Sequence, residues 1–195
     1  MEISAEQVRK LRETTGAPLM DCKKALLESE GDADRAVDLL RRWGRASAER
    51  RSGRETKEGR VGVYLHHDGK KGVLVEVACE TDFVARSERF NVFVKHAAMH
   101  VAAARPRYVS REEVPPEVVA KERDILRESV AGKPSEVAER ILDGKMKKFF
   151  AETVLLDQPF VKDESRTVGD LLKELAAAVG EHVVVRRFAH YEIGR

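Results

Sequence analysis

The sequence has 195 residues and a mass of 21.9 kDa, which suits one or two domains, and its 42% hydrophobic content is enough for a buried core. Its 36 Lys and Arg residues nearly balance 34 Asp and Glu, and the resulting net charge of +2 argues against a protein held mainly by nucleic-acid phosphates. The two cysteines have no CxxC spacing and form no disulfide framework, which favours a reducing compartment. No apolar run approaches the ~20 residues of a membrane span, and no signal-peptide core is present. We therefore expect a cytoplasmic protein.

Residues 1–43 predict three short helices. A capping box at Ser4 opens the first helix, which stops at Gly16. Pro18 suits the first turn of the second helix, and Asp32 can cap the third. Three helices in so few residues make a small bundle with a marginal core.

The turn before the second helix carries Leu19 and Met20, two large flexible apolar side chains, and Lys23 follows. In one interpretation the two apolar residues belong to the core of the bundle. In the other they form a small exposed patch that docks on another protein, a use to which the adaptable shape of methionine is suited.

Residues 44–60 contain no large apolar residue, and three glycines interrupt a run of Arg, Lys and Glu. Such a segment predicts a mobile or loosely helical tether. Its bases could touch RNA, but interleaved glutamates and the lack of an aromatic residue favour a solvated linker. We therefore expect no direct binding of nucleic acid.

A core module begins at residues 61–114 and is completed by the end of the chain. The predicted strands are Val61–His67, Val73–Cys79 and His182–Phe188, and the predicted helices are Glu88–Ala104 and Val168–Val179. Asp68 and Gly69 between the first two strands are a strong hairpin signal. The pattern predicts an α+β fold, with a three-stranded antiparallel sheet and helices on one face.

The segment Cys79–Ser87 joins the second strand to the first core helix. It is predicted to be a loop, yet it places the aromatic ring of Phe83 beside the carboxylate of Asp82. Phe83 could fold back as a core residue or hydrophobic staple. Alternatively, it is a probe that inserts into a partner.

Residues 115–152 predict two helices joined by a Gly/Pro turn, an antiparallel helical-hairpin arm, and residues 153–195 return to the core. His96 and His100 stand four apart on the first core helix, but Ala97 replaces the Glu of a zinc-protease pair and no third ligand is evident. We expect no metal, no cofactor and no catalytic residue, since no nucleophile, phosphate loop or acid-base pair stands out.

Several of these motifs resemble one family. Thr81-Asp82-Phe83-Val84-Ala85 resembles the signature loop of the bacterial elongation factor Ts family, the guanine-nucleotide exchange factors of the GTPase elongation factor Tu. Thr15-Gly16-Ala17 with residues 20–26 resembles its amino-terminal ubiquitin-associated-like module, with Leu19 where a methionine is common. Residues 132–134, 146–149 and 158–161 resemble its coiled-coil arm and return segment.

The resemblance implies a role in translation elongation, in protein biosynthesis. Thr81, Asp82, Phe83 and Val84 would disturb the magnesium and phosphate site of elongation factor Tu, and Leu19, Met20 and Lys23 would hold its GTPase domain. By looser correspondence, His66, His67, Val161, Val179 and Gly180 would touch the same partner, although each also has an ordinary structural interpretation. A non-exchange adaptor that binds another protein through the first three helices is the alternative.

The chain departs from the usual bacterial form of the family in two ways. Only one β-hairpin module is present, and the chain stops at Arg195 without the carboxy-terminal helix. We therefore expect two copies to pair as a homodimer, burying sheet or edge surface that one copy leaves exposed.

Overall fold

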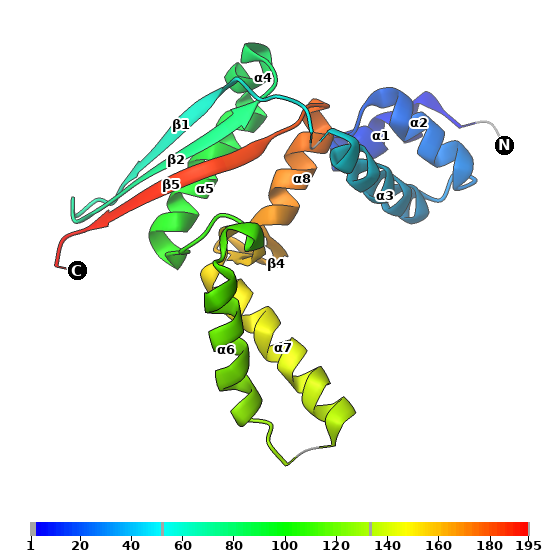
Figure 1. Ribbon diagram of the computed structural model, residues 1–195. Helices are drawn as coiled ribbons and strands as arrows, with labels where there is room; N and C mark the ends of the chain where they lie inside the picture. The colour runs from blue at the N-terminus through cyan, green and yellow to red at the C-terminus, as the bar shows by residue number, and fades with distance from the viewer. Residues whose placement is uncertain (1–2, 52, 133, 195) are drawn as a thin grey trace. The chain divides into compact units, whose positions relative to one another are not determined.

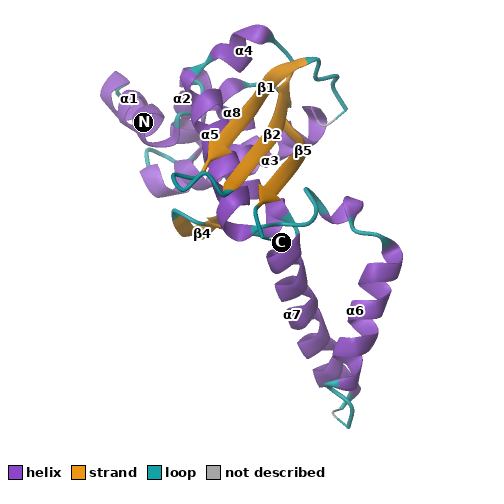
Figure 2. Ribbon diagram, turned by 90° about the vertical axis from the view of Figure 1, so that its left-hand side faces the viewer, coloured by secondary structure: helices purple, strands orange, loops and turns teal. Residues whose placement is uncertain are grey.

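The computed structural model describes residues 3–51, 53–132 and 134–194. These residues form an α+β fold with eight α-helices and a three-stranded antiparallel sheet in the order β1-β2-β5 (Figures 1 and 2), which confirms the predicted class. The chain divides into two compact units. Unit 1 contains Met1–Gly59, Ala78–Phe90 and Leu172–Val184, and unit 2 contains Arg60–Val77, Asn91–Leu171 and Val185–Arg195.

Three helices open unit 1: α1 (Ala5–Thr15), α2 (Leu19–Glu28) and α3 (Ala33–Arg51). The capping box at Ser4 is present, and Gly16 ends α1 in the left-handed conformation that favours glycine. Asp32 caps α3 by accepting a hydrogen bond from the Arg35 N–H at 3.0 Å. The buried faces of the helices form one small core of Val8, Leu11, Cys22, Ala25, Leu26 and Ala36.

Helix α3 is longer than the sequence predicted. It continues to Arg51 instead of ending near residue 43, and the first strand begins at Glu58, so both elements enter the predicted linker. Contacts within unit 1 account for the extra turns: a Cβ at Gly44 would lie 3.4 Å from the Ala177 Cβ, and the Arg51 guanidinium donates to the Ala176 carbonyl at 3.3 Å. The charged composition of residues 44–60 could not predict these contacts, because they are made with a segment more than a hundred residues away.

The sheet consists of β1 (Glu58–Leu65), β2 (Lys71–Cys79) and β5 (Val184–Glu192). The β1-β2 turn has Gly69 at a φ of 68°, and the His66 N–H donates to the Lys71 carbonyl at 2.9 Å, as the hairpin signal predicted. Helices α5 (Glu88–Ala104) and α8 (Val168–Val179) have the bounds that their periodicity predicted.

The two faces of the sheet differ in burial. On the face covered by α5, Val73, Val75 and Val77 are buried, and a Cβ at Gly62 would meet the Val94 side chain at 2.4 Å, so only glycine allows this approach. On the opposite face, five large side chains are between 44% and 68% exposed: Val61, Val63, Leu65, Leu74 and Tyr191. We refer to these five residues as the open sheet face.

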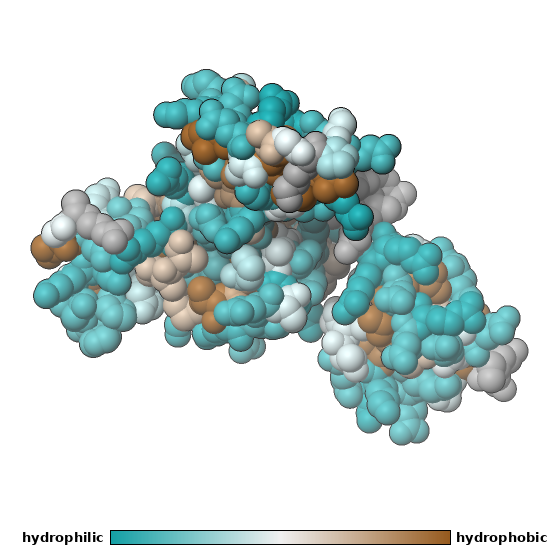
Figure 3. Space-filling view, turned by 90° about the horizontal axis from the view of Figure 1, so that it is seen from below, coloured by the Kyte–Doolittle hydropathy of each residue, from teal (hydrophilic) through white to brown (hydrophobic). Residues whose placement is uncertain are grey.

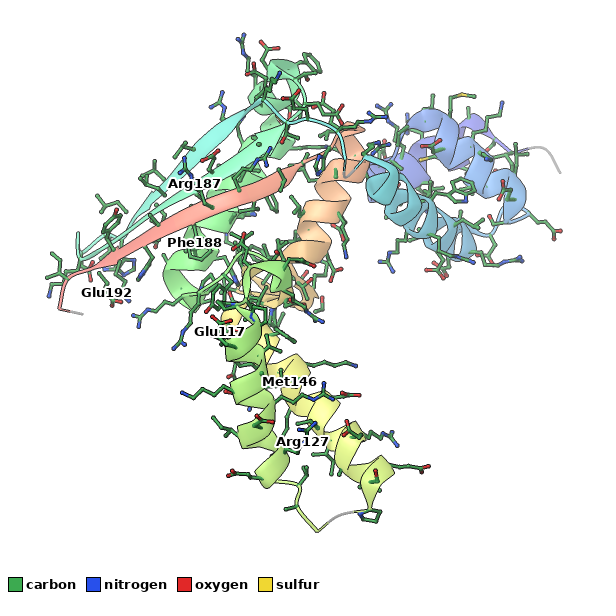
Figure 4. All side chains as sticks on the ribbon, viewed as in Figure 1. Glu117, Arg127, Met146, Arg187, Phe188 and Glu192 are labelled. Atoms are coloured by element: carbon green, nitrogen blue, oxygen red, sulfur yellow. The ribbon has the colours of Figure 1, made fainter. Side chains whose placement is uncertain are left out.

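Ion pairs flank both faces of β5. Figure 4 labels Arg187, Phe188 and Glu192 along this strand. The Arg187 guanidinium donates to Glu76 of β2 at 2.7 Å, beside the open sheet face. The Glu192 carboxylate accepts from Arg105 at 2.8 Å on the side of α5.

The arm consists of α6 (Pro116–Glu128) and α7 (Ser135–Thr153), which lie side by side in Figures 1 and 2. Its core is thin: Leu142 and Met146 (labelled in Figure 4) are buried, whereas Ile125 is 52% exposed. Lys133 of the predicted turn lies outside the described residues.

Most of the surface in Figure 3 is hydrophilic, with hydrophobic residues in small groups, as expected for a chain with 36% charged residues.

A short polar segment in unit 2 was not predicted to be regular. The 3-10 helices η1 (Arg111–Glu113) and η2 (Leu155–Asp157) flank the arm, and β3 (Pro159–Phe160) pairs with β4 (Asp163–Thr167) as a small antiparallel ribbon. The strands are too short and too polar to show an alternating pattern.

His100 has a structural role in unit 2. Its Nδ1 accepts the Val161 N–H at 3.3 Å, so its Nε2 carries the proton donated to the Gln158 side-chain oxygen at 2.9 Å. Burial lowers the pKa of His100, in keeping with a neutral ring.

Across residues 3–51, 53–132 and 134–194, no three His, Cys, Asp or Glu side chains are arranged to hold a metal, and no helix could cross a membrane.

A candidate partner-binding site

The segment predicted to be a loop is a short helix, α4 (Asp82–Arg86). Thr81 is the N-cap of this helix, because its side-chain oxygen accepts the Val84 N–H at 3.4 Å. This capping interaction was not predicted from the sequence. The Phe83 side chain is 81% exposed on this helix. Asp82 is also exposed and forms an ion pair with Arg86 at 3.0 Å. The ring and the carboxylate therefore project from an ordered turn.

The opposite side of α4 is buried. Val84 and Ala85 are 5% and 4% exposed, and Phe90 at the start of α5 is fully buried. Val84 was predicted to contact a partner together with Phe83. Consecutive helical residues point in different directions, and in this structure Val84 points into the core. Its burial fixes the helix that presents Phe83.

Glu181 joins α4 to the turn after α8 within unit 1. One carboxylate oxygen accepts the backbone N–H groups of Glu80 and Thr81, both at 3.1 Å. The other accepts the Thr81 hydroxyl proton at 2.6 Å. A single side chain about a hundred residues away therefore makes three hydrogen bonds to the start of α4.

Glu80 makes the reciprocal connection. Its carboxylate accepts the His182 backbone N–H at 2.6 Å and the Arg54 guanidinium at 3.3 Å. The His182 N–H, with Arg54 adding to it, lowers the pKa of Glu80 below its ordinary value. The His182 ring also contacts the Arg54 carbonyl at 2.9 Å. Two carboxylates thus connect the two turns by hydrogen bonds. Arg54, one of the bases of residues 44–60 that were considered above as possible RNA contacts, pairs with Glu80 within the protein.

A second exposed patch lies on α2. Leu19 and Met20 are 49% and 71% exposed, and Lys23 is exposed on the same helix. Leu27, which is 52% exposed on the same helix, was not among the predicted contact residues. Its spacing of four residues from Lys23, and eight from Leu19, is the signal that could have identified it. We refer to these four residues as the docking patch.

Gly16 connects the docking patch to the start of α5 within unit 1. The Arg89 guanidinium donates to the Gly16 carbonyl at 3.3 Å and lies only 2.5 Å from where a Cβ at Gly16 would be. The end of the flexible Arg89 side chain could move aside, so it is the φ of 69° at Gly16 that favours glycine.

The remaining candidate residues divide between the two units. Val179 is half-buried and Gly180 is exposed in unit 1, together with α4 and the docking patch. His66, His67 and Val161 belong to unit 2. The His66 ring contacts the Tyr64 hydroxyl at 3.0 Å, and the Val161 backbone N–H donates to His100.

Cys79 is the last residue of β2, three positions before α4 begins, and its thiol donates to the Thr81 carbonyl at 3.2 Å. Burial raises the pKa of this thiol to about 11. At pH 8 only about one thiol in a thousand would then be a thiolate, so we expect iodoacetamide to label Cys79 very slowly in the folded protein and at an ordinary rate in guanidinium. Peptide mass spectrometry measures this, with Cys22 as an internal comparison because burial raises its pKa as well. Rapid labelling of Cys79 alone would show that the start of α4 opens.

Comparison with known proteins gives one consistent result. The family model described as "Elongation factor TS" matches residues 23–195. The chain is 54% identical over 196 residues to elongation factor Ts of Geotalea uraniireducens, covering all of this chain and 91% of that protein. It is 53% identical over 194 residues to elongation factor Ts of Moorella thermoacetica, covering 98% and 96%. It is 50% identical over 194 residues to that of Thermotoga neapolitana, covering 100% and 98%.

Proposed function

The chain belongs to the elongation factor Ts family, and from this premise we propose that it is the guanine-nucleotide exchange factor of elongation factor Tu, acting in translation elongation in the cytoplasm. It binds elongation factor Tu carrying GDP, promotes the release of GDP and leaves the nucleotide-free GTPase ready to bind GTP. It catalyses no chemical reaction of its own. The observation that carries this proposal is the exposed Phe83 ring on a helix with a buried base.

Exchange follows from thermodynamic linkage. A protein that binds the GTPase more tightly when GDP is absent must weaken GDP binding by the same factor. To accelerate GDP release a thousandfold, the release barrier must fall by roughly 4 kcal/mol. Burial of one phenyl ring in the partner contributes only ~1.5 to 3 kcal/mol. Phe83 therefore acts together with other contacts.

In the mechanism we propose, Phe83 inserts into elongation factor Tu near the site that holds magnesium and the nucleotide phosphates. Asp82 and Thr81, at the start of α4, approach the same region, and Asp82 shifts the adjoining helix of the partner. The disturbed magnesium coordination weakens the hold on GDP. The docking patch, in a module that we propose to be ubiquitin-associated-like, binds the GTPase domain at a second place. Val179 and Gly180 are in the same unit and are proposed as additional contacts.

The direct test is to mix the protein with elongation factor Tu loaded with fluorescent GDP and to follow the loss of fluorescence in a stopped-flow instrument. Accelerated release in proportion to the concentration of the protein is expected. An unchanged release rate at saturating protein contradicts the proposal.

The exposure of Met20 leads to a separate prediction. Because its side chain is 71% exposed, Met20→Ala should leave the thermal unfolding temperature nearly unchanged but weaken the complex about five- to tenfold, as expected for a side chain that is buried only on binding. Titration with elongation factor Tu measures the affinity. Leu26→Ala, on the buried face of the same helix, is the matched control and should lower the unfolding temperature. If Met20→Ala lowers the unfolding temperature as much, the docking patch is part of the core.

The docking patch by itself would also suit a non-exchange adaptor, since exposed Leu19 and Met20 could bind a different protein. That alternative gives no function to Phe83. A protein that binds a partner through α2 while GDP release stays constant would support the adaptor.

We also propose that the protein is a homodimer that pairs through the open sheet face. Its five large side chains are exposed on one side of a sheet whose other side is covered by α5. A second copy related by twofold symmetry would present the same apolar face and so complete a two-layer core. Sedimentation at micromolar concentration tests this, and a monomer there contradicts it.

A further inference from the structure

The start of α4 is fixed from outside its own segment. Helix α4 has only five residues, which is too short to be stable alone in water. Its position depends on the buried base and on the bonds at Thr81. One of these bonds is local and joins the Val84 N–H to the Thr81 side-chain oxygen. The others come from Glu181, on the turn between α8 and β5.

Thr81 is the residue that these two groups of bonds share. Its side-chain oxygen accepts the Val84 N–H and so caps α4, while its hydroxyl proton is donated to Glu181 at 2.6 Å. A hydroxyl that donates one proton can accept at the same time, so the two bonds are compatible. The bond to Glu181 fixes the rotation of the hydroxyl and therefore directs its lone pair at the Val84 N–H.

We infer that Glu181 is a positioning residue for nucleotide exchange: through Thr81 it holds α4 in the orientation that presents Phe83 to the partner. The inference rests on the proposed function and deepens it. Glu181 need not touch elongation factor Tu for this role. Glu80 supports this arrangement from the other turn. Its carboxylate accepts the His182 N–H, next to Glu181 in the chain, and so helps to position Glu181.

The consequence is kinetic. A ring that must enter a partner in one orientation loses effectiveness when its helix samples others, because only the competent fraction reacts. Glu181→Gln keeps the size of the side chain but replaces one of the two accepting oxygens by an NH2 group, which can only donate. The remaining oxygen can accept either from the N–H groups of Glu80 and Thr81 or from the Thr81 hydroxyl, but not from both sets. The fold should persist, since Val84, Ala85 and Phe90 remain buried.

A double-mutant cycle tests this. We expect Glu181→Gln to slow stimulated GDP release about five- to tenfold in the wild-type background but less than about twofold in the Phe83→Ala background, since there is then no ring left to position. Glu136→Gln, an exposed glutamate of α7, is the matched control and should change neither rate. Equal slowing by Glu181→Gln in both backgrounds overturns the inference, because it would indicate a direct contact or a general loss of structure.

A second pair of variants examines the same bond from the other end. Thr81→Val removes the hydroxyl while keeping the shape, and should behave like Glu181→Gln, whereas Thr81→Ser keeps the hydroxyl and should restore most of the rate. If Thr81→Val exchanges as fast as the wild-type protein, the inference is wrong even if Glu181→Gln unfolds. The two failures are distinguishable: a wild-type protein that does not accelerate GDP release defeats the proposed function, while an additive cycle defeats only the role of Glu181.

Discussion

Phe83→Ala should slow the release of GDP from elongation factor Tu at least about tenfold at saturating protein, with no change in the fold. The fold should persist because the ring is 81% exposed and leaves no cavity when it is removed. The loss of rate should be larger than the loss of affinity, since the proposed ring acts on the nucleotide site and the docking patch still holds the partner.

Two measurements separate these effects. Stopped-flow release of fluorescent GDP at increasing protein concentration gives the maximal rate and the half-saturating concentration independently. Ile125→Ala is the matched control, because it also removes an exposed apolar side chain but lies on α6 in unit 2. A maximal rate equal to that of the wild-type protein would rule out Phe83 as the wedge, whatever happens to the affinity.

Val63→Glu should convert the proposed homodimer to a monomer. Val63 is 66% exposed on the open sheet face of one copy and would be buried against a second copy. Twofold symmetry places the new carboxylate in the interface twice, where burial of a charge without a partner is costly. We expect the dissociation constant to rise at least about a hundredfold, or roughly 3 kcal/mol.

Sedimentation velocity from nanomolar to micromolar concentrations measures this shift. Ile125→Glu adds the same charge to another exposed apolar position and should leave the dimer unchanged. If both substitutions have equal effects, net charge and not the open sheet face controls association. A wild-type protein that is monomeric throughout would refute the dimer itself.

The regular elements could largely be predicted from the sequence, because their signals are local. Caps and apolar periodicity located the start of α1 and the bounds of α5 and α8, and Asp68-Gly69 located the β1-β2 turn. Where the determining contacts are distant, prediction failed. The end of α3 depends on contacts with residues near 176, and the capped helix α4 replaced a predicted loop.

The site could be predicted only in part, for a similar reason. Short sequence motifs identified Phe83, Leu19, Met20 and Lys23 as candidates. For the first three, the sequence was compatible with either a buried or an exposed side chain. The fold decided among these positions: Phe83, Leu19 and Met20 are all exposed. Leu27 was overlooked because an exposed leucine looks like a core leucine in a periodic pattern.

What the sequence determined by itself is most of the longer helices and strands and the residue types at the proposed contacts, since these follow from chemistry within a few neighbouring residues. What only the tertiary structure decided is which of those side chains face water and what holds them there. Glu181 reaches Thr81 across a hundred positions of the chain, and five apolar residues from three strands gather on one face of the sheet. Such relations exist only after the chain has folded, because they depend on contacts between segments that share no local pattern.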